Sequence, residues 1–385
     1  MPNKTKQSDE KINICFVALG AYPLLARKDP KNVIGPDVHQ VILAKELIKH
    51  DFKITFITQD KEKASVEYID GIEIIKIQED AYRSRILNII LRVFRIWAAM
   101  RRANAHIYVH RGGVAGVVSP FCRISNKKYI CQIASDALVN RALVDRKIRE
   151  FSQSIFSLDT IGYWLDIKFA DAIIVQNKYQ RVMLSKNFGK DGIIIKKPFP
   201  LTERGKPEKA KPPIVLWVGA MAEVKQPELF VKLAEAIPEV KFQMIGGHSD
   251  NQPLYDRTKQ SSKRILNFEY FGVIPFDEIN EYYSRASILV NTSMFEAYPP
   301  YADIQAWMNY TPVVSLGDNL DEIICKYTMG FHSKTFNQLV EDVKALLKDE
   351  KIREEMGVNG RMYVEREHDL TNIVREYIKL FDRIV

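Results

Sequence analysis

The sequence lacks long apolar segments and has few cysteines. No run of 18 apolar residues is free of charge, and the first residues, MPNKTKQSDEK, are polar. This pattern excludes a typical membrane-spanning helix and the apolar core of a signal peptide, so the default expectation is a cytoplasmic protein. Three of the four cysteines lie in apolar surroundings, and we expect buried free thiols in place of a disulfide framework or a metal site. The cysteines are Cys15, Cys122, Cys131 and Cys325.

Acidic residues are absent from one long segment. Between Ala81 and Ser135 there is no Asp or Glu, whereas eight Arg and two Lys fall there. Over the whole chain, 56 Lys and Arg exceed 48 Asp and Glu, which gives a net charge of +8. A segment of one sign indicates an anionic partner, such as a phosphate-bearing substrate, an anionic membrane surface or nucleic acid. No nucleic-acid-binding motif accompanies it, so we expect no nucleic acid partner.

The length and the alternation of elements predict two α/β domains. A chain of 385 residues exceeds one ordinary hydrophobic core, and 46% of its residues are hydrophobic. Two series of alternating strands and helices are separated by a segment rich in Pro and charge at 198–213, which is typical of a linker. We therefore expect domains at 1–200 and 201–365, followed by a C-terminal helix at 366–385.

The first strand, loop and helix form a candidate phosphate site. Ile12 to Leu19 predicts a buried strand, Gly20 to Gly35 a loop, and a helix opens at Pro36-Asp37. The loop lacks GxGxxG, so a dinucleotide site is not supported. A helix N-terminus can bind phosphate, but Gly35 could equally serve only the geometry of the turn.

An edge hairpin and an arginine-bearing helix follow. Asp70-Gly71 between two apolar segments predicts a hairpin. Residues 83–102 predict a helix with a narrow polar stripe containing Arg85, Arg92, Arg95 and Arg102. Such a helix either packs within the N-terminal domain or lies in the interface of an anionic membrane.

Two polar residues follow strands of the first series. Arg111 comes after the strand at 106–109 and precedes an apolar helix expected at Val114 to Cys122. It could meet phosphate or form a structural salt bridge. Asp136 closes the strand at 128–133 and could position an acceptor hydroxyl or cap the next helix.

The second series contains the stretch with the most chemistry, residues 291–315. A strand at 288–290 leads into a loop that holds Glu296, and a helix at 302–309 and a strand at 311–315 follow. In a parallel sheet this arrangement places a carboxylate at the carboxyl edge of the strands, where ligands bind. Beyond it, we expect residues 321–327 and Gly330 to complete the sheet, and three helices to end the chain.

The same stretch resembles the donor-sugar loop of retaining GT-B glycosyltransferases of family 4. The resemblance rests on Glu296-Ala297-Tyr298-Pro299, Gln305-Ala306-Trp307 and Pro312-Val313-Val314. The sequence departs from the family pattern in three ways, since Ala297 replaces Gly, Gln305 replaces a second Glu, and one extra residue separates the two segments. The resemblance covers nearly the whole chain and implies a GT-B fold, two Rossmann-like domains facing across a cleft. It also implies that the C-terminal helix at 366–385 crosses back onto the N-terminal domain.

The resemblance also implies roles for individual residues. Lys225 would neutralise the departing diphosphate, although Ala220 stands where the family has Arg, and Glu296 would accept hydrogen bonds from the donor sugar. Gln305 would bond the ribose, while Asp136 completes the expected catalytic group. The further donor-binding residues are expected to be Gly35, Arg111, Gly219, Gly247, Val273, Ile274, Ala297 and Tyr298.

The implied reaction transfers a sugar from a nucleotide-diphosphate sugar to a glycan or lipid-linked acceptor in cell-surface polysaccharide synthesis. No Asp-x-Asp pair occurs in the sequence, which argues against a metal-chelating GT-A design, so we expect a metal-independent hexosyltransferase without a cofactor. Retention of the anomeric configuration follows from the family. A noncatalytic nucleotide-sugar-binding homologue or partner subunit is the alternative, and an unrelated GT-B enzyme such as an epimerase is a third reading.

Overall fold

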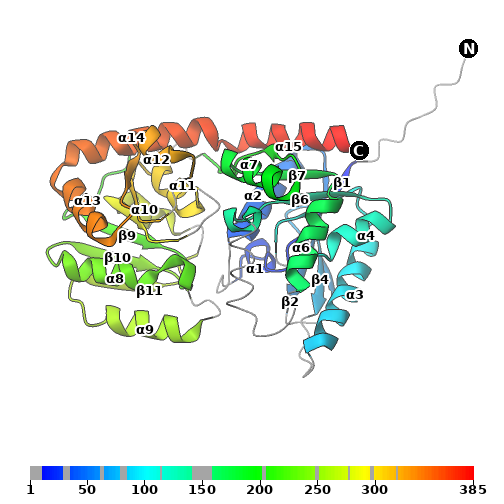
Figure 1. Ribbon diagram of the computed structural model, residues 1–385, viewed down its shortest axis with the longest axis horizontal. Coiled ribbons are helices and arrows are strands. Elements are labelled where there is room, and N and C mark those ends of the chain that lie inside the picture. The colour runs from blue at the N-terminus through cyan, green and yellow to red at the C-terminus, as the bar shows by residue number, and fades with distance from the viewer. Residues whose placement is uncertain are drawn as a thin grey trace, which may run out of the picture.

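The structure is a computed structural model containing two sheets, each in its own half of the molecule (Figure 1). Both sheets are layered between helices, because their central strands are buried apolar segments without an exposed face. The described residues are 11–28, 35–60, 65–78, 85–112, 115–140, 158–201, 205–247, 251–275, 278–294, 299–317 and 320–385.

The first sheet has eight strands in the order β3-β4-β2-β1-β5-β6-β7-β8. All neighbours are parallel except β3 and β4, whose antiparallel hairpin turns at Asp70-Gly71 and confirms the predicted edge hairpin. The strands are β1 (Asn13–Val17), β2 (Lys53–Asp60), β3 (Ser65–Ile69), β4 (Ile72–Gln78), β5 (Ile107–His110), β6 (Lys128–Gln132), β7 (Ala172–Val175) and β8 (Ile193–Ile194).

Helices cover both faces of this sheet. One face packs with α2 and α15, and the other with α3, α4, α6 and α7, in two separate apolar clusters. A short helix, α1, lies in the segment predicted to be only loop, and α4 begins four residues later than predicted, after Gly116 with its φ of 73°. The helices are α1 (Tyr22–Leu25), α2 (Gly35–Leu47), α3 (Arg85–Ala103), α4 (Val118–Ile124), α6 (Leu158–Phe169), α7 (Lys178–Phe188) and α15 (Leu370–Ile384).

The second sheet has six strands, all parallel, in the order β11-β10-β9-β12-β13-β14. The strands are β9 (Ile214–Val218), β10 (Lys241–Ile245), β11 (Phe268–Gly272), β12 (Ile288–Asn291), β13 (Val313–Ser315) and β14 (Gly330–His332). The helices are α8 (Pro227–Ala236), α9 (Gln252–Ser262), α10 (Asn280–Arg285), α11 (Tyr301–Met308), α12 (Ile323–Lys326), α13 (Phe336–Lys348) and α14 (Glu350–Glu367).

The prediction that residues 321–327 complete the second sheet was wrong. They form the 3₁₀ turn η4 (Leu320–Glu322) and α12, and β14 occupies the sheet edge. Ile323 and Ile324 are buried in the core of this half. A short apolar pair looks the same in sequence whether a helix or a strand buries it.

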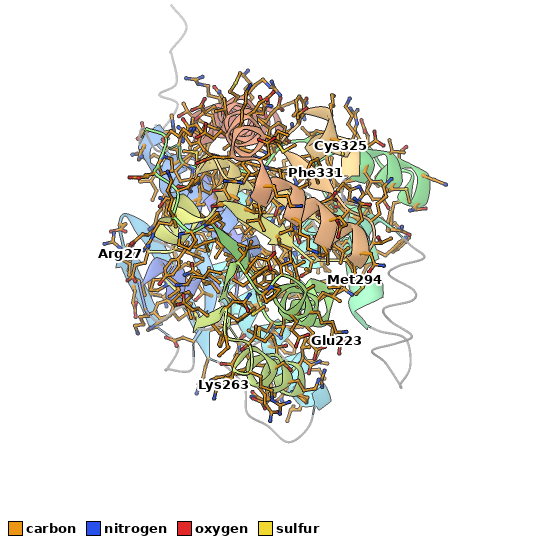
Figure 2. The ribbon with its side chains drawn as sticks, turned by 90° about the vertical axis from the view of Figure 1, so that its left-hand side faces the viewer. Arg27, Glu223, Lys263, Met294, Cys325 and Phe331 are labelled. Carbon is orange, nitrogen blue, oxygen red and sulfur yellow. The ribbon has the colours of Figure 1, made fainter. Side chains whose placement is uncertain are left out.

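The predicted buried thiols are confirmed for three cysteines. Cys15, Cys122 and Cys131 are buried, and none of the four cysteines forms a disulfide. Cys325 is exposed, as Figure 2 shows at its position on the second half, because it lies on the outward face of α12. Burial raises the pKa of the Cys15 thiol well above its usual range.

The last two helices run along both halves of the molecule, with α14 over the second half and α15 over the first (Figure 1). The apolar side chains of α15, among them Tyr377 and Phe381, belong to the same cluster as those of β1 and α2. Near the crossing, the backbone of Phe199 bonds to His368 and Leu370. The chain therefore passes between the halves at two adjacent points, one near residue 199 and one near residue 369.

Each sheet has a topological switch point, where successive crossover connections turn to opposite sides. In the first sheet it lies between β1 and β5, and in the second between β9 and β12. The carboxyl ends of strands at such a point leave a crevice in which α/β proteins bind ligands. The fold alone therefore marks two places for functional residues.

Candidate functional site

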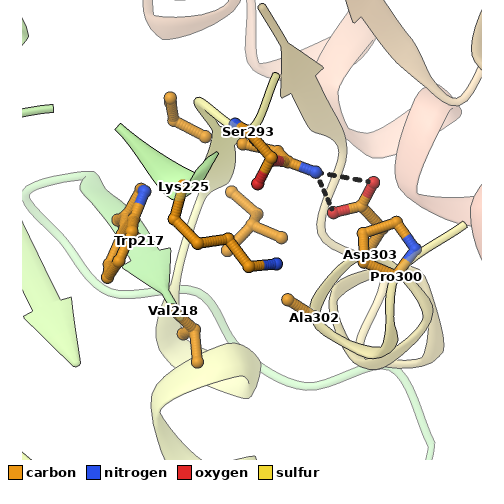
Figure 3. Close-up of a pocket in the computed structure, with 10 residues that line it drawn as sticks. Trp217, Val218, Lys225, Ser293, Pro300, Ala302 and Asp303 are labelled. Carbon is orange, nitrogen blue, oxygen red and sulfur yellow. Dashed lines mark hydrogen bonds between the residues drawn. The ribbon is translucent and has the colours of Figure 1, made fainter. Parts of the chain in front are cut away.

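A pocket lies at the switch point of the second sheet (Figure 3). It contains about 250 Å³ of empty space, part of it open to solvent. Its ten lining residues come from the ends of β9 and β12, the turn before α8 and the first turn of α11. They are Trp217, Val218, Lys225, Leu289, Val290, Asn291, Ser293, Pro300, Ala302 and Asp303.

Lys225 is held in this pocket by its backbone. It ends the short 3₁₀ turn η3 (Glu223–Lys225) that follows β9. The hydroxyl of Thr292 donates to the Lys225 carbonyl at 2.6 Å, and the Trp217 indole N–H donates to that hydroxyl at 2.9 Å. Figure 3 shows the ammonium end of the side chain extending toward Asp303 and Pro300. A cation is thus presented inside the crevice.

A backbone contact joins the Lys225 turn to the segment after β12. The Met294 N–H donates to the Val224 carbonyl at 2.8 Å. Figure 2, which looks onto the second half, shows the neighbouring Glu223 and Met294 close together. The contact ties the Lys225 turn to the chain that leads toward Glu296.

Asp303 is a pocket residue that the sequence analysis did not single out. It lies in the first turn of α11, is fully buried, and accepts hydrogen bonds from the Asn291 amide at 3.2 and 3.4 Å. Asn291 in turn accepts from the Ser293 N–H at 2.9 Å. The sequence did contain a signal for Asp303. An acid in the first turn of a helix that follows a candidate ligand-binding loop can meet a ligand as well as start the helix.

The N-terminus of α11 points its first turn at the pocket. Pro300 is the N-cap residue and provides no side-chain cap, and both Pro300 and Ala302 line the pocket. A helix start without a side-chain cap offers N–H groups and a positive partial charge to an anion. Gln305, one turn further along α11, is buried but is not among the lining residues.

Glycines let the carboxyl ends of β9 and β10 approach closely. A Cβ on Gly246 would lie 1.9 Å from the Gly219 carbonyl oxygen, and a Cβ on Gly219 would lie 3.1 Å from the Trp217 ring. The Gly247 carbonyl accepts from the Met221 N–H at 2.9 Å. This edge is therefore bare backbone, which a ligand can approach closely.

The expected base-contacting residues follow β11 along the same edge of the second sheet. Val273 is 38% exposed, and Ile274 packs partly against the core of this half. Neither lines the Lys225 pocket. The side chain of Val273 therefore leaves apolar surface after β11, two strands away from β9 in the sheet.

The candidate residues of the first half follow strands of the first sheet or begin α2. A Cβ on Gly35 would lie 3.8 Å from the Tyr301 ring, so the start of α2 meets the start of α11. Arg111 follows β5 and is buried. Asp136 is buried and accepts from the Asn177 and Gln180 side-chain amides at 3.0 and 2.6 Å, at the start of the 3₁₀ turn η2 (Asp136–Val139).

The structure thus brings only part of the predicted site together. Lys225 lies in the pocket, and Gly219 lies beside it. Arg111 and Asp136 sit at the carboxyl edge of the other sheet, outside the lining residues. Glu296, Ala297 and Tyr298 lie outside the described residues.

The fold defines the class of this protein. Two mostly parallel sheets covered by helices, joined by a helix that returns to the first half, match solved GT-B structures. Residues 200–363 match the family described as "Glycosyl transferases group 1", so the second half carries the group 1 signature. The predicted GT-B fold is confirmed. The match to group 1 covers residues 200–363, and assignment of the chain to family 4 stays a prediction.

Solved structures similar to this chain share its fold at low sequence identity. Sucrose-phosphate synthase from Thermosynechococcus elongatus is 17% identical with a TM-score of 0.80, covering 97% of this chain and 99% of that one. HepE from Anabaena in complex with UDP-glucose is 11% identical with a TM-score of 0.74, covering 97% and 100%. A glycosyltransferase from Rickettsia africae is 14% identical with a TM-score of 0.67, covering 97% and 98%. No curated protein sequence matches this chain.

Proposed function

We propose that the protein is a retaining, metal-independent glycosyltransferase that uses a nucleotide-diphosphate sugar. The observation that carries the proposal is the pocket in which Lys225 and the start of α11 converge at a switch point, within the segment that matches group 1 glycosyl transferases. A cation and a helix N-terminus directed at one crevice suit a diphosphate leaving group.

Each donor-binding residue has a proposed task. Lys225 and the N–H groups of α11 stabilise the diphosphate, and Glu296 accepts hydrogen bonds from the sugar hydroxyls. Gln305 bonds the ribose, with an amide that can both donate and accept. Backbone at Gly35, Gly219 and Gly247 approaches the phosphates and sugar, and the chain at Val273 and Ile274 contacts the base.

The neighbours suggest which donors to test first. HepE was solved with UDP and with UDP-glucose, and the pneumococcal GtfA with UDP and GlcNAc. Uridine diphosphate sugars are therefore the first choice for this chain. We place the acceptor among glycans or lipid-linked oligosaccharides of cell-surface polysaccharide synthesis.

We also propose that α3 attaches the protein to the inner, anionic face of a membrane. Its first half exposes four large apolar side chains: Leu87 at 43%, Ile89 at 40%, Ile90 at 46% and Phe94 at 66%. Arg92, Arg101 and Arg102 are exposed on the same helix. Apolar side chains next to arginines suit the boundary between acyl chains and anionic headgroups. No helix among the described residues is long and apolar enough to cross a membrane.

Turnover distinguishes an active transferase from a noncatalytic homologue. The noncatalytic homologue is the second candidate function, because Ala220 and Gln305 replace the Arg and Glu of the family pattern. The purified protein is incubated with UDP-glucose and UDP-GlcNAc, and released UDP is measured with and without a mixed glycan acceptor pool. We expect UDP release that Lys225→Ala lowers at least about a hundredfold, since a diphosphate-stabilising cation contributes about 3 kcal/mol. The exposed Lys232→Ala on α8 is the matched control and should keep full turnover. Donor binding without release from any sugar nucleotide would establish the noncatalytic reading.

A further inference from the structure

The switch point of the first sheet holds a buried arginine with unsatisfied donors. Arg111 directly follows β5, next to the carboxyl end of β1, and is 2% exposed. Its Nε and Nη1 atoms are buried without a hydrogen-bond partner. Buried guanidinium groups are normally paired, because an isolated buried charge is costly.

Among the described residues, no carboxylate affects the pKa of Arg111. Its electrostatic neighbours are Tyr301, Tyr377 and Tyr163, and burial lowers the pKa of the guanidinium. Burial lowers the pKa of His39 well below its usual range, and the charges of Arg111 and the buried Lys197 lower it further. Within the part of the chain that the structure describes, the buried Arg111 guanidinium therefore has no carboxylate partner at the carboxyl edge of the first sheet, where α2, α11 and α15 meet.

Further unpaired polar atoms lie next to this arginine. The Tyr377 hydroxyl accepts from the Gln132 amide at 3.0 Å and contacts His39 Nε2 at 3.1 Å. When the Tyr377 hydroxyl donates its hydrogen bond to Nε2, the hydrogen of the neutral imidazole is on Nδ1. His39 Nδ1 is buried without a hydrogen-bond partner. Gln132 Oε1 is also without a partner. The region thus offers donors for an anion and an acceptor for a hydroxyl.

This region is separate from the Lys225 pocket. All ten residues of that pocket belong to the second half, and none is an electrostatic neighbour of Arg111. The two places approach each other at the start of α11, where Pro300 lines the pocket and Tyr301 acts on Arg111. Two substrates, one at each switch point, could therefore meet at the first turn of α11.

We propose that Arg111 binds an oxyanion, a phosphate or carboxylate, on the acceptor substrate and takes no part in holding the donor diphosphate. The proposal rests on the transferase function proposed above and names the acceptor as anionic. The planar fork of the guanidinium fits either anion with two parallel hydrogen bonds. His39 Nδ1 then donates a hydrogen bond to a neighbouring oxygen of the same acceptor substrate, and Gln132 Oε1 accepts one from a hydroxyl of that substrate.

Binding of small anions tests the proposal without knowledge of the acceptor. Inorganic phosphate and, separately, acetate are titrated into the full-length protein by calorimetry, with and without saturating UDP. We expect one of the two anions to bind in the presence of UDP, and Arg111→Gln to weaken that binding at least about tenfold, as expected for lost hydrogen bonds to a charge. The exposed Arg123→Gln should bind as wild type, and UDP affinity should be unchanged in both variants. The anion that binds identifies phosphate or carboxylate.

Melting temperatures of the free proteins provide a second readout. Because no carboxylate among the described residues acts on Arg111, Arg111→Gln should melt at or above the temperature of wild type. A structural role would instead lower the melting temperature and leave anion binding intact, and this result would overturn the proposal. A loss of UDP affinity in Arg111→Gln, or no binding of either anion by wild type, would also overturn it. If wild type fails to bind UDP at all, the donor assignment fails, while the anion titration without UDP still decides the role of Arg111.

Discussion

At the scale of single residues, the resemblance to family 4 pointed to the cation of the pocket but not to its buried surroundings. Lys225 was singled out because it stands where that family has a lysine, in the loop after Gly219. Asp303 was missed, because an acid in the first turn of a helix is an ordinary helix-start signal. The unpaired state of Arg111 was also beyond the sequence, since a partner could have come from any part of the fold.

Asp37 provides a test of a buried carboxyl group. It is 4% exposed, its Oδ2 has no hydrogen-bond partner, and burial raises its pKa to about 7. A Cβ on Gly20 would lie 2.4 Å from that oxygen, so the loop after β1 packs closely onto the carboxyl group. The fold therefore favours the neutral form, and the associated stability is lost as the pH rises from about 4 to about 7.

We expect Asp37→Asn to stabilise the protein more at pH 8 than at pH 5. The amide removes a charge penalty that reaches at most about 4 kcal/mol once the carboxyl is ionised. Melting temperatures of both proteins at the two pH values measure the effect, with Asp382→Asn on the exposed side of α15 as control. An equal change at both pH values would show that the Asp37 carboxyl does not ionise between them.

At the scale of elements, α3 shows what its sequence pattern left open. The second half of the helix buries Ile96, Met100 and Ala103 in the core of the first sheet. The first half exposes Leu87, Ile90 and Phe94, which are spaced three and four residues apart on one face. Periodicity predicted the helix. Which of its turns are buried depends on how far the neighbouring strands extend, and α3 therefore packs in the core at one end and is exposed at the other.

Co-sedimentation with vesicles tests the membrane role of α3. We expect the protein to bind vesicles of phosphatidylcholine with phosphatidylglycerol and not vesicles of phosphatidylcholine alone, with binding that weakens as salt rises. Phe94→Ser should weaken binding about tenfold, because burying one such side chain contributes about 1.5–3 kcal/mol. Met362→Ser, which changes an apolar side chain 58% exposed on α14, is the control. Equal binding to both lipid compositions would contradict an anionic surface as the partner.

At the scale of the whole molecule, the sequence predicted the alternation of strands and helices and the α/β class. The family resemblance implied a final helix that crosses back onto the N-terminal domain, but not which side chains it meets there. Tyr377 on α15 bonds to His39 on α2, 338 residues away, and to Gln132, 245 residues away. Such contacts depend on the packing of complete sheets and have no local pattern. They place the final helix beside the acceptor region proposed around Arg111.

The central claim, a donor site in the Lys225 pocket, is tested most directly by thermal stabilisation. Melting temperatures are measured with uridine, guanosine and adenosine diphosphates and their sugars, for wild type, Lys225→Ala, Glu296→Ala and the control Lys232→Ala. We predict that one nucleotide raises the melting temperature of wild type and Lys232→Ala, and that Lys225→Ala loses most of this shift. No shift with any nucleotide, or a full shift in Lys225→Ala, would contradict the assignment of this pocket to the donor.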